Sequence, residues 1–437
     1  MKPTTFITGL SALALAASAS ADVTVNITGA TAFRAATLAS IKAKYVASGA
    51  AFKFAHDQAT SGTTIYTGAT RAIFIGTFPG VTGTTTIRCC FTGSVEGVRS
   101  LTGAADAVPP TYYQPSLLTS TTAAVGGAEL HNQGTTGAAT ATSHIAFSDV
   151  NRAATPYSGY SLQPADPAVG VIVFTMLTNE GSTVTNVTSQ QFRALMSNGF
   201  QPLSLFTGNA ADETNVFAVG RNDGSGTRTA YLAETGAGIT NLVKQYVANV
   251  STGSALTQIQ LVPAGGVNSP SLTGQNVKNK STVWSQDVAG NGGYESGSTL
   301  RTDMGKTGAS VTVLDETGAD AFGEPVRADL VTWLSLNDAV TARGNGAILC
   351  SYNGVKLSDI AASGSTMSAA DKAKVTNGAY TAWSYQQMYR RNDITSGDAV
   401  TVYNGLKAAI PTNLGAAGLA LTDMAAGRET DGGTVGY

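Results

Sequence analysis

The residue types that bind a small oxyanion occur together in residues 221–227, which read Arg-Asn-Asp-Gly-Ser-Gly-Thr. The two glycines of this stretch let the backbone approach a ligand closely, because they carry no side chain. The hydroxyls of Ser225 and Thr227 are donors, and Arg221 supplies a two-pronged charged contact. We therefore expect an oxyanion cradle at this turn.

The place of this stretch in the chain favours the same chemistry. A strand is predicted over 215–219 and a helix over 227–234, so free backbone N–H groups and the positive end of the helix meet at the strand's carboxyl edge. We expect Asp223 to hold the arginine in place. The alternative is an ordinary capped turn, in which Ser225 caps the helix and Asp223 forms the turn.

Strands and helices alternate along the rest of the chain. Helix 35–46 is amphipathic, with Leu38, Ile41 and Tyr45 on one side, and Ser189 is the expected cap of helix 190–196. Residues 169–176 are apolar without alternation, as buried strands of parallel sheets are. Further strands are predicted over 22–27, 87–91 and 145–148, with a helix over 95–101. Strands that lead through short loops into helices predict an α/β fold with mostly parallel sheets.

Two stretches interrupt this alternation. Residues 104–143 are rich in Thr, Gly, Ala and Pro, and we expect a loop-rich insertion on the surface. Residues 265–308 hold many Gly, Asn and Ser residues but too few apolar ones for a clear element, and a small β-hairpin is the alternative.

Composition limits the classes of function. The 437 residues are 43% hydrophobic, which is too many for a disordered chain, and the length suggests two or three domains. Only 12% are charged, and the formal net charge is -2, which argues against a nucleic-acid-binding surface.

The first 21 residues have the pattern of a cleaved signal peptide. Lys2 precedes the apolar stretch 6–17, which is too short to span a bilayer, and Ala19-Ser20-Ala21 is a small-residue cleavage site. We expect a mature chain that begins at Asp22, is exported to the periplasm or the medium and is not inserted in the membrane. A buried N-terminal helix is the alternative.

Cysteine and histidine indicate neither a disulfide framework nor a metal site. The cysteines are Cys89, Cys90 and Cys350, an odd number, and a bond from either of the first two to the third is left open. The three histidines lie far apart without ligand spacing, so no metal is expected. No cofactor is expected either.

At residues 221–227 the sequence resembles the substrate-binding component of high-affinity phosphate ABC transporters, which carries an Arg-x-Asp-Gly-Ser-Gly-Thr element. Weaker similarities follow in the family's order. They are Thr28-Gly29-Ala30-Thr31-Ala32-Phe33, Thr92-Gly93-Ser94, Ala146-Phe147-Ser148-Asp149, Gly346-Ala347-Ile348 and Asn377-Gly378-Ala379-Tyr380. They span almost the whole mature chain, and only the 221–227 element is specific.

The resemblance implies a type II periplasmic-binding-protein fold, with two Rossmann-like lobes joined by crossing strands and a ligand cleft between them. The first lobe would be 22–165 with 376–437 returning to it, and the second 166–375. The implied ligand is phosphate or a related small oxyanion, passed to a membrane permease. The implied binding residues are Thr31, Ala32, Phe33, Ser94, Asp149, Arg221, Asp223, Ser225, Gly226 and Thr227.

Asp149 suits that role on physical grounds. A buried carboxylate accepts a hydrogen bond from the proton of hydrogen phosphate and repels fully ionised sulfate. The alternative for Asp149 is a helix or turn cap beside Asn151.

The sequence also departs from the family's pattern. Ala32 replaces a threonine, so one hydroxyl is missing or displaced to Thr31, and Arg34 adds a positive charge where the family has proline. Glu96 would disfavour an anion unless it points away or pairs with Arg34 or Arg99.

Three classes of function remain. The first is capture of an oxyanion for transport or sensing, without catalysis. The second is a surface or structural protein that keeps the binding fold with a degenerate site. The third is a secreted phosphatase, for which Ser225 is the one evident nucleophile and no base is evident near it in sequence.

Overall fold

The computed structural model describes residues 22–264, 277–278, 287–357, 367–415 and 418–437. The predicted signal peptide lies outside these residues, as does most of 265–286. Within the described ranges, no helix has the length and apolar character needed to cross a bilayer.

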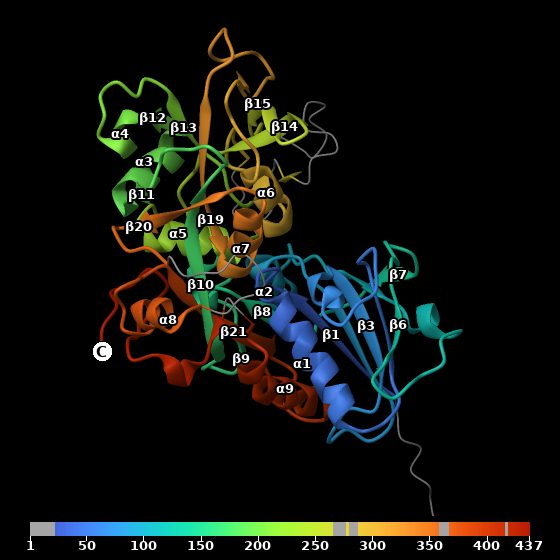
Figure 1. The fold of residues 1–437 in the computed structure, drawn as a ribbon. Helices are drawn as coiled ribbons and strands as arrows, with labels where there is room; N and C mark the ends of the chain where they lie inside the picture. The colour runs from blue at the N-terminus through green and yellow to red at the C-terminus, as the bar shows by residue number, and fades with distance from the viewer. Residues whose placement is uncertain (1–21, 265–276, 279–286, 358–366, 416–417) are drawn as a thin grey trace, which may run out of the picture.

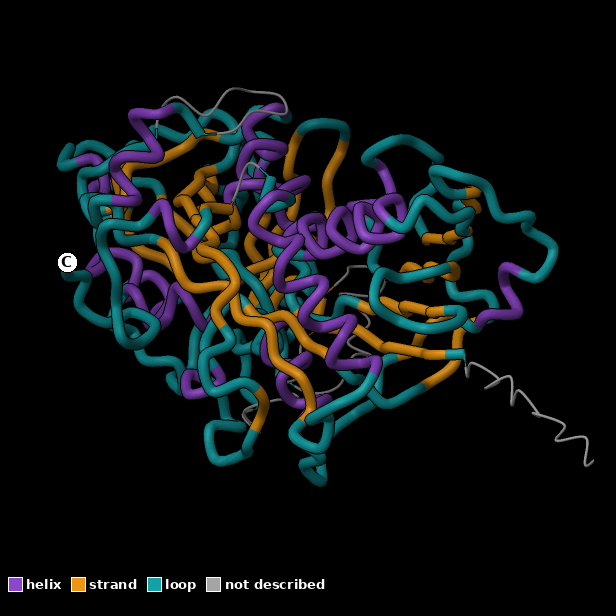
Figure 2. Tube along the Cα trace, turned by 90° about the horizontal axis from the view of Figure 1, so that it is seen from below, coloured by secondary structure: helices purple, strands orange, loops and turns teal. Residues whose placement is uncertain are grey.

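The chain forms two lobes, in which helices lie beside the strands (Figure 1). Viewed from below, helices and strands lie side by side across the width of the molecule (Figure 2). The helices are α1 (Arg34–Ala47), α2 (Ser94–Thr102), α3 (Ser189–Asn198), α4 (Ser204–Thr207), α5 (Gly226–Glu234), α6 (Gly297–Met304), α7 (Leu336–Gly344), α8 (Ala369–Thr376) and α9 (Asp398–Ala409).

The strands follow in chain order. They are β1 (Val23–Gly29), β2 (Lys53–His56), β3 (Arg71–Gly76), β4 (Thr85–Cys90), β5 (Thr111–Tyr113), β6 (Ala128–Leu130), β7 (Ala138–Thr140), β8 (Ile145–Ser148), β9 (Leu162–Gln163), β10 (Ala168–Thr178), β11 (Asn186–Val187), β12 (Phe200–Pro202), β13 (Asn215–Ala218), β14 (Tyr246–Thr252), β15 (Ala255–Leu261), β16 (Val277–Lys278), β17 (Gly293–Tyr294), β18 (Thr312–Leu314), β19 (Ala328–Ser335), β20 (Ile348–Tyr352), β21 (Trp383–Arg391) and β22 (Gly418–Leu419). The predicted α/β class is confirmed, and the sheet is mixed.

Strand order places the first lobe at one end of a continuous sheet and the second at the other. The order is β12-β13-β19-β10-β21-β8-β1-β4-β3-β2-β6. β1 lies between β4 and β8 and pairs in parallel with both, and β13 pairs in parallel with β19. Because parallel neighbours run in the same direction, β1, β4 and β8 end at one edge of the sheet, and β13 and β19 end together at another.

Strand β10 joins the lobes. Its first half pairs with β21, Val173 opposite Trp383, and its second half pairs with β19, Phe174 opposite Ser335. The prediction that its apolar run belongs to parallel pairing is wrong, because all of its partners run antiparallel. An unbroken apolar run reports burial on both faces and not the direction of the neighbours.

Each lobe has its own apolar core. In the first lobe, Ile145 and Phe147 of β8 face the side covered by α1 and α9, and Ala146 faces α2 on the other side, as strand alternation requires. Leu38, Ile41 and Tyr45 are buried in that first core, as predicted. The second core is centred on β10, β13 and β19 and includes Trp333.

The C-terminal return contributes to both cores. Met388 and residues 402–414 pack in the first core, whereas Tyr380, Ala382, Trp383 and Leu419 pack in the second. A boundary near residue 376, as the resemblance implies, stays a prediction.

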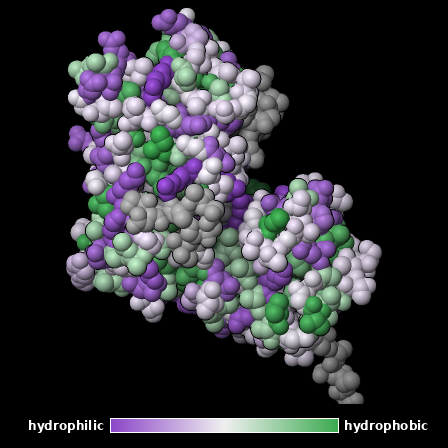
Figure 3. All heavy atoms as spheres, in the orientation of Figure 1, coloured by the Kyte–Doolittle hydropathy of each residue, from purple (hydrophilic) through white to green (hydrophobic). Residues whose placement is uncertain are grey.

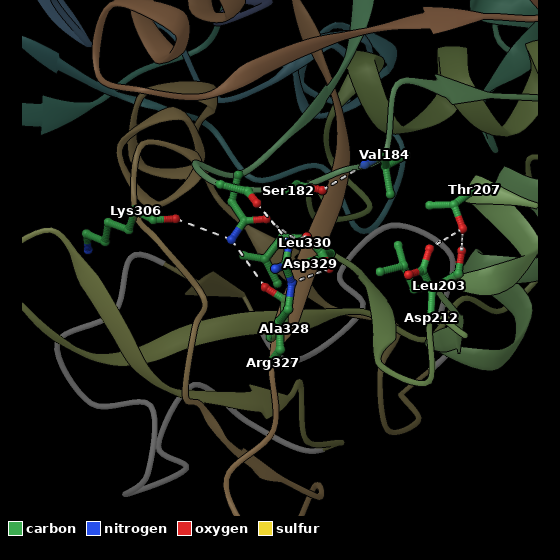
Figure 4. Close-up of polar contacts among 12 residues, drawn as sticks. Ser182, Val184, Leu203, Thr207, Asp212, Lys306, Arg327, Ala328, Asp329 and Leu330 are labelled. Carbon is green, nitrogen blue, oxygen red and sulfur yellow. Dashed lines mark hydrogen bonds and ion pairs between the residues drawn. The ribbon is translucent and has the colours of Figure 1, made fainter. Parts of the chain in front are cut away.

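A buried asparagine fixes one end of the second lobe, at the start of β19. The Asn179 amide donates to the carbonyls of Ala328 (3.2 Å) and Lys306 (3.3 Å), and its oxygen accepts from the N–H of Leu330 (2.7 Å). Figure 4 shows Lys306, Ala328 and Leu330, the partners of this asparagine. It also shows Arg327 and Asp329, which form an ion pair (3.1 Å).

Three sequence predictions need correction here. Helix α3 is capped by Thr188 in a capping box with Gln191, and not by Ser189. The 104–143 segment is more than a surface loop, because Tyr113 and Leu118 are buried against the sheet and β6 extends its edge. The 265–308 segment, for which no clear element was expected, contains α6. Its antiparallel β16–β17 pair agrees with the alternative of a small β-hairpin.

The cysteine pairing that the sequence left open does not form. Cys89, Cys90 and Cys350 are free and buried, as small packed side chains. The fold keeps them apart, because Cys89 and Cys90 lie in β4 of the first lobe and Cys350 lies in β20 of the second.

Candidate functional site

The predicted cradle lies at the junction of the lobes. β13 ends at Ala218, the turn follows, and α5 begins at Gly226. Ser225 is the N-cap of α5, and its hydroxyl accepts from the N–H of Arg228 (3.4 Å). The capped-turn interpretation is therefore correct for Ser225, which leaves its hydroxyl hydrogen as a donor.

The first two N–H groups of α5 point to a further acceptor. A helix cannot bond its own first N–H groups. In the described part of the chain, the N–H groups of Gly226 and Thr227 have no hydrogen-bond acceptor. Both residues are buried, so the positive end of the helix is closed off from bulk water at this point.

Arg221 links the two lobes. Its Nε donates to the carbonyl of Tyr294 (3.1 Å), its Nη2 to the carbonyl of Glu295 (2.8 Å), and its Nη1 to Oγ1 of Thr31 in the first lobe (3.4 Å). The side chain is only 2% exposed. The expectation that Asp223 holds this guanidinium is wrong, because backbone carbonyls from 294–295 take that place.

The charge of Arg221 is buried with neutral acceptors around it. Among the described residues, Arg221 forms no ion pair with a carboxylate. Burial lowers the pKa of Arg221 to about 10, and the more distant carboxylates of Asp338 and Asp149 oppose that shift. An uncompensated buried cation is costly, and an anionic ligand would relieve the cost.

The first lobe meets the cradle at the start of α2. The N–H of Val95 donates to the carbonyl of Gly224 (3.1 Å). A Cβ on Gly226 would lie 2.3 Å from Oγ of Ser94 and 2.9 Å from Cβ of Asp149. The predicted residues Ser94, Asp149 and 224–226 therefore converge, and Gly226 is needed for close approach of the other lobe.

Asp149 lies next to the contact between Ser94 and Gly226. The alternative interpretation of Asp149 as a helix or turn cap is wrong. Its N–H donates to Oγ of Ser94 (3.0 Å), and its Oδ1 accepts from Nε2 of Gln386 (2.5 Å). Burial raises the pKa of Asp149 above the usual carboxyl range, although hydrogen bonds from Gln386 and Ser94 oppose the shift. The cap in this loop is Asn151, whose side chain accepts from Ala153.

The start of α1 supplies the third helix end. The Thr31 hydroxyl accepts from Nη1 of Arg221, and displacement of the hydroxyl absent at position 32 to Thr31 stays a prediction. Ala32 packs in the second lobe's core. Phe33 is the N-cap residue of α1 and packs against Phe147, with ring centroids 5.7 Å apart.

The negative charge of Glu96, which would disfavour an anion in the site, is neutralised within its own helix. Glu96 forms an ion pair with Arg99 one turn later in α2, and both side chains are buried. This is one of the two pairings that the sequence left open.

A cavity of about 470 Å³ opens between the lobes beside this junction. The space-filling view shows a hollow between the two bodies (Figure 3). From the first lobe the cavity is lined by Thr31, Arg34, Asp57, Thr70, Arg71, Cys90, Phe91 and Thr92. From the second lobe it is lined by Glu295, Ser296 and Ser298. Arg221 lies behind two of these lining residues, Thr31 and Glu295.

Sequence reasoning missed the residues that complete the junction. Gln386 comes from β21, where Ser384 and Gln386 are buried polar residues two positions apart. That pattern was a usable signal, because buried polar groups need partners. Tyr294 and Glu295 act through their carbonyls, which no side-chain pattern reveals.

The chain has structural but not sequence matches among known proteins. No protein-family model and no curated protein matches it. It is similar to the crystal structure of a protein from Clostridium perfringens described as a phosphate ABC transporter substrate-binding protein, with bound phosphate (11% identity, TM-score 0.42, covering 91% of this chain and 99% of that one). It is also similar to an ABC-type phosphate transport receptor from Vibrio cholerae (11%, 0.41, covering 90% and 96%).

Proposed function

We propose that the protein captures a small oxyanion, phosphate or a close analogue, between its lobes. The single observation that carries this proposal is Arg221, a buried cation held by carbonyls at the meeting point of α1, α2 and α5. Three positive helix ends and one buried guanidinium favour an anion strongly over a neutral or cationic ligand.

Asp149 would select the protonation state of the ligand. A carboxylate at this position accepts a hydrogen bond from the P–OH group of hydrogen phosphate, and sulfate has no such donor. The ligand-binding residues in this proposal remain those that the sequence implied, with Gln386 orienting Asp149 and the carbonyls of 294–295 orienting Arg221.

Export and delivery to a membrane permease complete the proposal. Residues 1–21 have the signal-peptide pattern described above. A two-lobed protein that closes on its ligand is suited to carry it to a partner in the membrane.

One observation favours a second candidate, a surface protein with a degenerate site. The lobes already contact each other directly, through Val95 and Gly224 and through Ser94 and Gly226. In that case the polar groups of the junction would serve only to hold the lobes together.

Calorimetric titration of the ligand-stripped mature chain separates these functions. We expect saturable binding of phosphate and arsenate, and much weaker binding of sulfate at neutral pH. No heat of binding with any of the three anions would favour the surface-protein candidate. Release of phosphate from a model ester would indicate a phosphatase instead.

A further inference from the structure

We infer that the ligand carries a second anionic group besides its phosphoryl group, as a condensed phosphate or a charged phosphate ester does, and that Arg34 binds this second group. The inference rests on the proposed function, because it assigns the phosphoryl group to the junction around Arg221. It adds the class of ligand and the residue that selects it.

The size of the cavity is the first observation. Pockets for small molecules run from roughly 300 to 1,000 Å³. The interlobe cavity, at about 470 Å³, falls in that range. A tetrahedral oxyanion alone would fill only a small part of it, so there is room for a further group beyond the junction.

The charge of Arg34 is the second observation. Arg34 lines the cavity from the first turn of α1, and among the described residues its side chain has no hydrogen bond or ion pair. Burial lowers the pKa of Arg34, and the charges of Asp338 and Asp57, which form no ion pair with it, oppose that shift.

Two of the acidic groups near the cavity already have partners. Asp338 is paired with Arg301 (2.8 Å). The carboxylate of Asp57 accepts from the N–H groups of Thr70 (3.0 Å) and Arg71 (2.9 Å). Glu295 also lines the cavity and is the remaining acidic side chain there.

The geometry joins Arg34 to the junction. Thr31, three residues before Arg34, accepts from Arg221 and lines the same cavity. On the opposite wall, Ser296 and Ser298 at the start of α6 offer hydroxyl groups. A ligand with its phosphoryl group near Arg221 would therefore extend past Thr31 toward Arg34.

The test compares pyrophosphate with methyl phosphate, because both carry a phosphoryl group and only pyrophosphate has a second anion. Calorimetry on the ligand-stripped mature chain should show pyrophosphate binding at least ~10-fold more tightly. Arg34→Ala should weaken pyrophosphate binding by ~10- to 100-fold and change methyl phosphate binding by less than ~3-fold. Arg34→Lys should retain part of the preference.

Three outcomes contradict the inference or its premise. Equal affinity of the parent for both compounds, or equal weakening of both by Arg34→Ala, overturns the role of Arg34 and leaves oxyanion capture standing. Binding of neither compound nor of inorganic phosphate by a folded parent overturns both. Arg193→Ala, at an exposed arginine of α3, is the matched control and should change neither affinity. Thermal unfolding of each variant confirms that it is folded.

Discussion

Arg221 and Asp149 are the two ionisable side chains at the centre of the site, and the burial of each disfavours its charged form. Both are buried, and burial lowers the pKa of the guanidinium and raises that of the carboxyl. Desolvation disfavours the charged form of each group. An anion that also donates one proton satisfies both, since it offers a negative charge to Arg221 and a hydrogen bond to Asp149.

Asp149→Asn should relax discrimination against sulfate more than it weakens phosphate binding, because an amide donates where a carboxylate cannot. In the parent, sulfate binding should tighten as pH falls, since burial raises the pKa of Asp149 and its carboxyl, once neutral, donates a hydrogen bond. The variant should lack this pH dependence. Sulfate titrations at several pH values check it, and a parent with pH-independent sulfate affinity would contradict the role of Asp149.

At the scale of elements, contact between the start of α5 and the start of α2 closes the site. Gly226→Ala should hold the lobes apart, because its Cβ would lie 2.3 Å from Oγ of Ser94. We expect weaker phosphate binding and a larger radius of gyration with phosphate present, measured by calorimetry and small-angle scattering. Gly159→Ala is the control, since no atom lies within 4 Å of a Cβ there. Equal compactness of the two variants would contradict this view of closure.

Helix α3 provides a test of capping. Thr188→Ala should lower the free energy of unfolding by about 1 kcal/mol, because it removes the side-chain oxygen that accepts from Gln191. Ser189→Ala should change it by less than ~0.5 kcal/mol. Denaturant unfolding measures both, and the reverse order would restore Ser189 as the cap.

Local patterns predicted the elements well and the long-range contacts poorly. The strand, turn and helix around 221–227 follow from hydrophobic spacing and glycine, which act over a few residues. The carbonyls of 294–295 and the side chain of Gln386 come from segments separated by dozens of residues. No periodicity in the sequence shows which distant carbonyl accepts from a guanidinium. The prediction that Asp223 holds Arg221 is therefore wrong, because the backbone carbonyls of 294–295 hold it.

At the scale of the whole molecule, the C-terminal segment ties the two lobes together behind the site. Arg428 pairs with Glu234 at the end of α5 (2.7 Å) and lies over the ring of Trp383 (4.2 Å). Asp431 accepts from the N–H of Asn151, two residues after Asp149 (2.7 Å). The segment thus contacts the far end of the helix whose start forms the cradle.

This segment should make stability depend on pH. Burial raises the pKa of Asp431 to about 6. The folded state then binds more protons than the unfolded state between about pH 4 and pH 6, so this contribution to stability falls as pH rises, by no more than ~3 kcal/mol. Asp431→Asn should remove that slope and keep the hydrogen bond to Asn151.

The pH dependence is checked by unfolding the parent and the variant across this range. Glu429→Gln, at an exposed residue near Asp431, is the control, and its free energy of unfolding should depend on pH as that of the parent does. A constant difference in unfolding free energy between parent and Asp431→Asn at all pH values would show that Asp431 titrates normally.

The affinity of Arg221→Ala for phosphate, measured by calorimetry beside the parent and Arg193→Ala, tests oxyanion capture most directly. Hydrogen bonds to charged groups are worth roughly 1.5–3 kcal/mol, so the loss of Arg221 should weaken binding by at least ~10- to 100-fold. Arg221→Lys should recover only part, because an ammonium lacks the planar fork. Arg193→Ala should bind as the parent does. Phosphate binding as tight in a folded Arg221→Ala as in the parent would contradict the proposal.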